Sequence, residues 1–279
     1  MEHTGIHYQK TGYLKTSFRL FHLTDDKRDT FAYHYHDFEK VLIFLRGDVT
    51  YHVEGRSYPL EPYDIVLIRA GEVHRPVIEK KTVYERIILY VSSDFLSSFA
   101  GEGADLSWCF QNAQKEQSHV LRLPAFTKNE LCQTIKKIEQ NGENSDFAKN
   151  LYQKTLFLEF MIQLNRAAAD QTVQYMEMSG ANEKIVAVVD YINEHLTEDL
   201  TIDSLSAYFY LSRYYLMHQF KKETGYTIGN YISTKRLLKA RNLIRDGSPV
   251  TRACYECGFK NYSTFSRAYK KQFGKSAVR

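Results

Sequence analysis

The chain has 279 residues and a formal net charge of +4 at neutral pH, and 43% of its residues are hydrophobic. This length and apolar content are sufficient for two domains with separate cores. No run of 18 apolar residues is present, and residues 1–10 lack the pattern of a signal sequence, so we expect a cytoplasmic protein without membrane contact. Four cysteines in this length do not suggest a disulfide framework.

Residues 17–92 are predicted to form β-strands. Short runs rich in Val, Ile, Leu, Phe and Tyr recur roughly every ten residues. Turn-forming residues separate these runs, among them Gly47, Gly55, Pro62 and Gly71. The gaps are too short for crossover helices, which argues against a parallel α/β sheet. The pattern therefore predicts a β-sandwich or a small barrel.

After these strands, a short helix is expected near residues 94–99 and a further strand near 119–123. Two longer helices are then expected over 127–140 and 145–168, where apolar residues recur at helical spacing. Apolar side chains cover much of the second long helix, so we expect it to be buried against the sheets, another helix or a second subunit. Its apolar positions are Phe147, Leu151, Leu158, Met161, Ile162 and Leu164.

Residues 169–182 lose helical periodicity, and we interpret them as a linker between an N-terminal domain, residues 1–168, and an all-helical C-terminal domain, residues 183–279. The predicted fold class is therefore α+β with two domains. The C-terminal segment has 16 Lys and Arg against 9 Asp and Glu, whereas the rest of the chain has 21 against 24. A basic segment joined to a near-neutral one suggests a module that binds a polyanion, although a solvated charged surface would have the same composition.

A ten-residue pattern occurs twice in the C-terminal segment, as LMHQFKKETG over 216–225 and as FSRAYKKQFG over 265–274. In both copies the first and fifth residues are apolar and lie on one helical face. Two lysines follow near the helix end, where cations oppose the helix dipole, and a glycine supplies a left-handed cap. Each copy predicts a short helix with an apolar back and a basic front, preceded by another helix at helix-turn-helix spacing.

This segment resembles the DNA-binding domain of the AraC/XylS family of bacterial transcription regulators. The resemblance covers residues 183–279 and rests on LSRYYLMHQFKKETGYT over 211–227, on CGF over 257–259 and on FSRAYKK over 265–271. The chain departs from the family after Gly274, where the family usually continues with a proline. The resemblance implies two helix-turn-helix units, whose second helices enter successive major grooves of double-stranded DNA about 34 Å apart.

The resemblance also implies which residues contact DNA. The base contacts that it implies come from Arg213, Tyr214, Met217 and His218 in the first recognition helix, and from Tyr262, Ser263, Ser266 and Arg267 in the second. A guanidinium can bind guanine through two hydrogen bonds, so the two arginines are the best candidates for direct base recognition. The lysines assigned to phosphates are Lys221, Lys222, Lys270 and Lys271, although any one of them is also typical of a solvated surface.

In the N-terminal segment, His34 and His36 lie at a strand boundary and alternation places them on one face. Glu39 and His74 are expected to converge with them inside a small barrel. Histidines with a carboxylate are a plausible ligand set for Zn, Fe or Mn. Hydrogen bonding of these histidines near the barrel rim is the simpler structural alternative.

Residues 15–92 resemble a cupin barrel, because HYHDFE over 34–39 is followed by Gly47, Gly55, PYD over 62–64 and His74. The chain has two residues between the second histidine and the glutamate, where metal cupins usually have three or four. Cupin-like sensor domains of AraC-type regulators keep this pattern and often bind a small effector. The resemblance therefore favours an effector over a metal or another cofactor.

An effector pocket needs an apolar lining and a few polar groups that converge on it. The candidate ligand-binding residues are Arg19, His34, His36, Glu39, Tyr51, His74 and Arg86. The 21 tyrosines would suit a carbohydrate, whose C–H surface stacks on aromatic rings, but aromatic residues also fill barrels.

These observations favour a non-enzymatic, effector-responsive transcription regulator that forms a homodimer through residues 127–168, with RNA polymerase as a further candidate partner. Two alternatives remain open at this point. One is a metal-dependent cupin enzyme fused to a DNA-binding module. The other is a DNA-binding protein that has no effector and whose barrel serves only for dimerisation.

Overall fold

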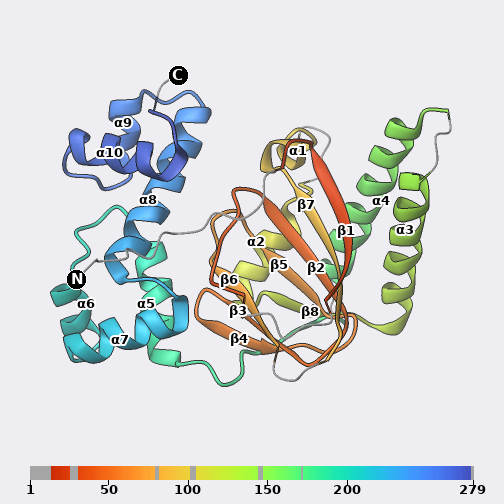
Figure 1. The fold of residues 1–279 in the computed structure, drawn as a ribbon, viewed down its shortest axis with the longest axis horizontal. Coiled ribbons are helices and arrows are strands. Elements are labelled where there is room, and N and C mark those ends of the chain that lie inside the picture. The colour runs from red at the N-terminus through yellow and green to blue at the C-terminus, as the bar shows by residue number, and fades with distance from the viewer. Residues whose placement is uncertain are drawn as a thin grey trace.

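The computed structural model describes residues 14–25, 31–78, 82–100, 105–143, 147–170 and 172–277. A β-rich domain, which comprises β1–β9 and α1–α4, lies beside a helical domain, which comprises α5–α10 (Figure 1). The helical domain and the α3–α4 pair lie on opposite sides of the sheets (Figure 1). The predicted α+β architecture with two domains is therefore confirmed.

Two antiparallel sheets form the β-rich domain. The larger sheet has the strand order β1-β7-β2-β5-β8-β9, with bounds Phe18–Asp25, Tyr84–Val91, Glu39–Arg46, Ile65–Ile68, Val120–Arg122 and Gln174–Tyr175. The smaller sheet has the order β4-β3-β6, with bounds Arg56–Pro59, Val49–Val53 and His74–Ile78. Over the described residues the two sheets stay separate, so the domain is an open, cupin-like jelly roll and the barrel is not closed.

Strand β2 has buried side chains on both of its faces, which explains its nearly continuous apolar sequence. Val41 and Ile43 belong to the core beneath the helices, whereas Leu42 and Phe44 belong to the core between the two sheets. The alternation of side chains along a strand requires this division. The same alternation determines on which side of the sheet each polar side chain of β2 lies.

The helices of the β-rich domain are α1, α2, α3 and α4, with bounds Ser93–Ser97, Trp108–Lys115, Ala125–Glu143 and Lys149–Ala169. The last helix begins four residues later than its apolar pattern predicts. Phe147 is therefore outside the helix and fully exposed, and Leu151 is 66% exposed, so within one chain neither residue packs against the sheets or another helix. Phe157, Phe160 and Met161 bury the opposite side of α4 against the sheet.

The helical domain contains α5, α6, α7, α8, α9 and α10, with bounds Glu183–Glu194, Ile202–Tyr208, Arg213–Thr224, Ile228–Arg245, Val250–Glu256 and Tyr262–Phe273. Polar side chains cap five of these helices, because each accepts a hydrogen bond from a backbone N–H of the first turn. Two separate apolar clusters form its core, and α8 contributes to both. This helix therefore connects two small subdomains.

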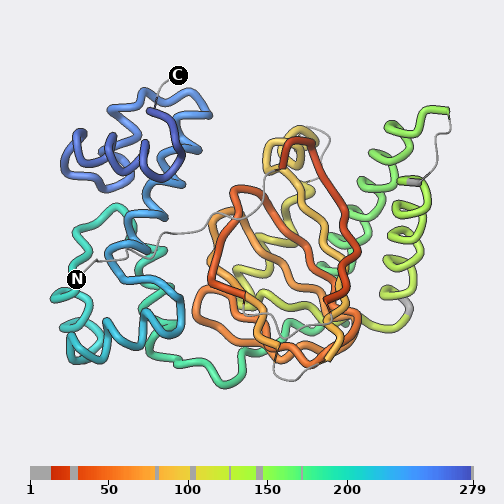
Figure 2. Tube along the Cα trace, in the orientation of Figure 1, coloured from red at the N-terminus to blue at the C-terminus, as the bar shows by residue number. Residues whose placement is uncertain are grey.

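The segment between the domains is partly structured. Strand β9 pairs with β8, and the backbone N–H of Met176 donates to Val120 O at 2.9 Å. The chain then passes along the lower edge of the sheets to α5 (Figure 2). The first half of the expected linker is therefore part of the larger sheet. None of the described helices is both long and apolar enough to span a membrane.

Candidate nucleic-acid interface and ligand site

The two copies of the repeated sequence form α7 and α10, each of 12 residues. Ser212 and Asn261 cap their N-termini, and Gly225 and Gly274 end them with φ angles of 76° and 71°. A positive φ of this size favours glycine, as the sequence predicts. The buried back faces consist of Leu216, Phe220, Phe265 and Tyr269.

The opposite faces of α7 and α10 are open to solvent. Eleven of the twelve residues expected to contact DNA are exposed, and Ser266 is half-buried. The exposed residues are Arg213, Tyr214, Met217, His218, Lys221, Lys222, Tyr262, Ser263, Arg267, Lys270 and Lys271. The repeat thus places basic, aromatic and hydroxyl side chains on two matching outer surfaces, which is the composition that contacts with phosphates and base edges require.

Weak contacts hold the two arginines in the free protein. Arg213 Nε lies 3.0 Å from Asp203 Oδ1, and both side chains are more than 60% exposed. Arg267 Nε donates to Ser263 O at 3.3 Å. Exposed ion pairs of this kind contribute at most about 1 kcal/mol, so DNA can replace these partners at low cost.

Helix α8 sets the separation of the two subdomains. Its 18 residues correspond to about 27 Å at the usual helical rise. One turn of B-form DNA is about 34 Å long. A single helix of this length therefore connects the two helix-turn-helix units.

Inside the β-rich domain, three histidines come together. His34 and His74 are opposite each other in an isolated antiparallel bridge, with ring centroids 4.4 Å apart. The ring of His36 lies 5.1 Å from that of His34 and 4.9 Å from that of His74. Burial is the main cause that lowers the pKa of His34 to about 4 and the pKa of His74 well below its usual value. The imidazoles of His34 and His74 are therefore neutral near pH 7.

Lys40 joins this cluster from β2, and its side chain is buried. Its Nζ donates to Tyr51 OH at 2.9 Å and to His74 Nε2 at 3.3 Å. Burial, and to a smaller extent the charge of Arg86, lowers the pKa of Lys40 to about 7. The sequence analysis did not include Lys40 among the candidates. The sequence spacing could have identified it. Three residues separate His36 from Lys40, as they separate the histidine from the carboxylate in metal cupins.

Glu39 does not converge with the histidines. Its carboxylate accepts hydrogen bonds from the Ala70 backbone N–H at 2.7 Å and from Ser93 Oγ at 3.1 Å. Neighbouring residues on a strand point to opposite faces, so when Lys40 faces the histidines, Glu39 faces away from them. Burial raises the pKa of Glu39 to about 7. The expected convergence of Glu39 with His74 is therefore wrong. The next residue along β2, Lys40, contacts His74 instead.

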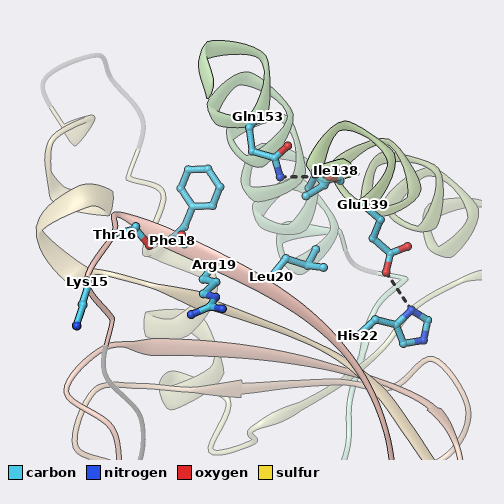
Figure 3. A pocket seen from close by; sticks show the side chains of 10 residues that line it. Lys15, Thr16, Phe18, Arg19, Leu20, His22, Ile138, Glu139 and Gln153 are labelled. Carbon is cyan, nitrogen blue, oxygen red and sulfur yellow. Dashed lines mark hydrogen bonds and ion pairs between the residues drawn. The ribbon is translucent and has the colours of Figure 1, made fainter. Parts of the chain in front are cut away.

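The remaining ligand candidates lie at two different places. Arg86 is buried, forms an ion pair with Asp25, and lies close enough to the cluster for its charge to act on Lys40 and Tyr51. Arg19 is exposed on β1 and lines a groove of about 900 Å³ between β1, α3 and α4 (Figure 3). Across this groove His22 Nδ1 lies 3.0 Å from Glu139 Oε1 (Figure 3). Arg19 therefore belongs to a surface groove on another part of the domain and not to the histidine cluster.

Residues 33–37 connect the histidine cluster with the helical domain. While His34 and His36 face the cluster, the alternate side chains contact the helices. Tyr33 OH donates to Glu223 O of α7 at 2.7 Å, and Gln272 of α10 donates to the hydroxyl of Tyr35. Asp37 Oδ2 accepts from Arg241 Nη1 of α8 at 2.9 Å. One short segment therefore contacts both recognition helices and the helix that joins them.

A second contact between the domains is centred on Glu54, which is buried at the end of the β3–β4 hairpin. Lys235 Nζ lies 2.9 Å from its Oε1, and the hydroxyl of Tyr231 donates to its other oxygen. Asn193 Nδ2 donates to the same carboxylate at 3.3 Å. Nearby, Arg56 forms an ion pair with Asp190 at 2.7 Å. Residues from α5 and α8 thus meet the smaller sheet through buried or half-buried charges.

Comparison with known proteins assigns both domains. A family model described as an AraC-like ligand binding domain matches residues 20–160, and one described as a helix-turn-helix domain matches residues 205–278. The HTH-type transcriptional activator RhaS of Escherichia coli strain SMS-3-5 is 24% identical over 253 residues, which cover 87% of this chain and 84% of RhaS. RhaS of Shigella sonnei is 23% identical over 251 residues, with the same coverage of both chains.

Solved structures are also similar. The DNA-binding domain of AdpA, determined in complex with a target DNA, is 27% identical, with a TM-score of 0.33, and covers 34% of this chain and 86% of its own. An apo ToxT variant from Vibrio cholerae is 14% identical, with a TM-score of 0.40, and covers 96% of this chain and 97% of its own.

The two family matches, together with the paired helix-turn-helix units, define a transcription regulator that has a DNA-binding domain and a ligand-binding domain. The chain belongs to the AraC family of transcriptional regulators. The resemblance seen in the sequence is therefore confirmed for both domains.

Proposed function

We propose that α7 and α10 bind two successive major grooves on one side of a DNA duplex. The observation that carries this proposal is the pair of matching outer surfaces on a repeated helix, connected by a single helix of 18 residues. Arg213 and Arg267 recognise bases, preferably guanine, with the other residues of the recognition helices beside them. The lysine pairs near the helix C-termini bind phosphates.

Selection of preferred sites from a random DNA pool tests this arrangement. The proposal predicts two specified blocks of bases whose centres are separated by about 10 base pairs, because the recognition helices meet the same side of the duplex. A single specified block, or two blocks on opposite sides of the duplex, would contradict it.

We further propose that the histidine cluster binds a small polar effector, with a carbohydrate as the first class to test. Tyr51 supplies an aromatic face and, with Lys40, polar groups at the cluster. The effector must bind one arrangement of the two domains better than the other, and residues 33–37 provide the path, since they face both the cluster and the helices.

A thermal-shift screen of sugars and other metabolites tests the effector proposal, because a ligand of the native state raises the unfolding midpoint. The expected hit loses its effect in a His34→Ala variant and keeps it in Arg19→Ala, which changes only the surface groove. The opposite pattern would move the effector site to that groove, and a screen without any stabilising compound would favour a protein that has no effector.

We propose a homodimer that forms through α4. Leu151 and Ile162 are 66% and 40% exposed, and their spacing of eleven residues places them on one side of the helix. Phe147, just before the helix, is a further fully exposed apolar side chain. Sedimentation analysis of a Leu151→Glu, Ile162→Glu double variant checks this, with a dimer expected for the unchanged chain and a monomer for the variant.

Since the relatives are named as transcriptional activators, we propose a regulatory and not a catalytic role, in which the DNA-bound protein contacts RNA polymerase. Transcription with purified polymerase from a promoter that carries a selected site is expected to change when the protein is added. An unchanged transcript level at saturating DNA occupancy would contradict this proposal.

A further inference from the structure

Lys40 is a buried cation without a negatively charged partner among the described residues. Its two hydrogen bonds go to neutral groups, and the charge that acts on it is that of Arg86, which is also positive. Asp25 forms its ion pair with Arg86. Burial and the charge of Arg86 both lower the pKa of Lys40, to about 7. A buried charge without a counterion is costly, so this place favours a negative charge and disfavours a further positive one.

The hydrogen bonds around Lys40 leave two donors over. An ammonium group has three N–H donors, and Lys40 uses two of them, to Tyr51 OH at 2.9 Å and to His74 Nε2 at 3.3 Å. Since the Tyr51 oxygen accepts from Lys40, its own O–H group is left as a donor. Neither this O–H nor the third N–H of Lys40 has an acceptor in the part of the chain that the structure describes. Two adjacent donors, one of them charged, match the two oxygens of a carboxylate.

A hydrogen-bond acceptor lies beside these donors. Nδ1 of His34 is 2.9 Å from Ala32 O, and a carbonyl oxygen can only accept, so Nδ1 carries the proton and Nε2 presents a lone pair. Among the described residues no donor reaches this Nε2. The ring of His34 is 4.4 Å from that of His74, which Lys40 contacts, and His34 is only half-buried. A ligand that approaches His34 from the surface can therefore donate a hydroxyl hydrogen to it.

We propose that the effector of the histidine cluster is a hydroxy acid, which rests on the effector site proposed above, with the uronates as the first sugar acids to test. The carboxylate of the acid accepts hydrogen bonds from Lys40 and Tyr51, and a hydroxyl group of the acid donates to His34 Nε2. A neutral sugar would leave the Lys40 charge without a counterion. A phosphate carries more charge and more oxygens than these two donors match.

Matched pairs of sugars test the proposal by direct titration into the full-length protein at equal ionic strength. Galacturonate and galactose, and glucuronate and glucose, differ only at the last carbon, where the uronate has a carboxylate and the neutral sugar a hydroxymethyl group. Galactose phosphorylated at the same carbon tests a phosphate, and tartrate is a hydroxy acid without a sugar ring. At least one of the acids is expected to bind about tenfold more tightly than either neutral sugar, because hydrogen bonds to charged groups are stronger than neutral ones.

Three variants locate the bound acid. Lys40→Met is expected to abolish the preference for the acid, and because it removes an uncompensated buried charge, its unfolding midpoint should not fall. Tyr51→Phe keeps the ring and removes one donor, so it is expected to weaken binding of the acid by about three- to tenfold. Lys15→Met is the matched control, because Lys15 is exposed and lines the surface groove beside β1 (Figure 3). It is expected to leave binding of the acid unchanged.

The outcomes separate the class of the ligand from the existence of the site. If a neutral or phosphorylated sugar binds more tightly than every acid, and His34→Ala removes that binding, the effector site stands and the hydroxy acid is wrong. The hydroxy acid is also wrong if Lys40→Met binds it as the unchanged protein does, or if Lys15→Met alone removes its binding. If no compound of the panel binds, the proposed carbohydrate effector fails together with this inference.

Discussion

The recognition helices and the histidine cluster differ in how their residues come together. In α7 and α10 the cap, the apolar back, the basic end and the terminal glycine all lie within about 14 residues of sequence, and each signal is local. In the cluster, His74 meets His34 across 40 positions of the chain and Lys40 enters from a third element. A helix can be predicted from neighbouring residues in the sequence. Which side chains meet in the cluster depends instead on how distant strands pair, which the sequence does not show directly.

The largest effect is expected at Glu54, whose buried ion pair with Lys235 joins the β-rich domain to the helical domain. Glu54→Gln leaves Lys235 without its carboxylate, so the free energy of unfolding should fall by about 3–5 kcal/mol. Denaturant unfolding measures this change. A Glu54→Gln, Lys235→Met double variant is the control and should recover most of the loss. Equal losses in the single and double variants would show that the ion pair does not hold the domains together.

The two helix-ending glycines provide a matched comparison. A Cβ at residue 225 would lie 2.4 Å from a ring carbon of Tyr33, whereas a Cβ at residue 274 would have no neighbour within 4 Å. Both positions have positive φ, which costs an alanine about 1–2 kcal/mol. Gly225→Ala should therefore destabilise by about 2–4 kcal/mol and Gly274→Ala by about 1 kcal/mol in thermal or denaturant unfolding. Equal effects would mean that Tyr33 does not press on the cap of α7.

On the DNA side, arginines and lysines should behave differently. Arg267→Ala or Arg213→Ala should cost about 1–3 kcal/mol of binding free energy and relax the preference at one base position. Lys270→Ala should weaken binding to all sequences equally and reduce the salt dependence by about one counterion. Binding to a panel of single-base variants at several salt concentrations measures both. If the arginine variants weaken binding to every sequence alike, they contact phosphates.

A smaller effect is expected from the pH dependence of Glu39. Its folded pKa is raised to about 7 by burial, above the ordinary value of 4.5. Between these values the native state holds a proton that the unfolded state releases, so stability should fall as pH rises from about 4.5 to 7. Glu39→Gln should flatten this part of the profile by about 1–3 kcal/mol. An unchanged profile would assign the dependence to other groups.

Much of the fold could be predicted from the sequence for identifiable reasons. Both copies of the ten-residue repeat form helices that end at Gly225 and Gly274 as expected, and apolar runs within residues 17–92 form the strands β2, β5 and β7. Strand β4 could not be located individually from composition, because Arg56–Pro59 has little apolar character and is buried only through tertiary contacts. The start of α4 was placed too early because the apolar side chain of Phe147 was taken as part of the helix.

The candidate site was predicted in part. His34, His36 and His74 converge as expected, because alternation and the cupin-like order of motifs determine them. The shift from Glu39 to Lys40 could not be foreseen from residue type, since a carboxylate is the more usual ligand. The contacts of Tyr33, Tyr35 and Asp37 with the helical domain have no local signal, because they depend on how two separately folded domains dock.

The central claim is that α7 and α10 enter neighbouring major grooves on one side of the duplex. Methylation interference at guanine N7, which faces the major groove, tests it most directly on a selected DNA site. The claim predicts two clusters of interfering guanines about 10 base pairs apart, the first lost in Arg213→Ala and the second in Arg267→Ala. One cluster alone, or two clusters that respond together to either variant, would contradict it.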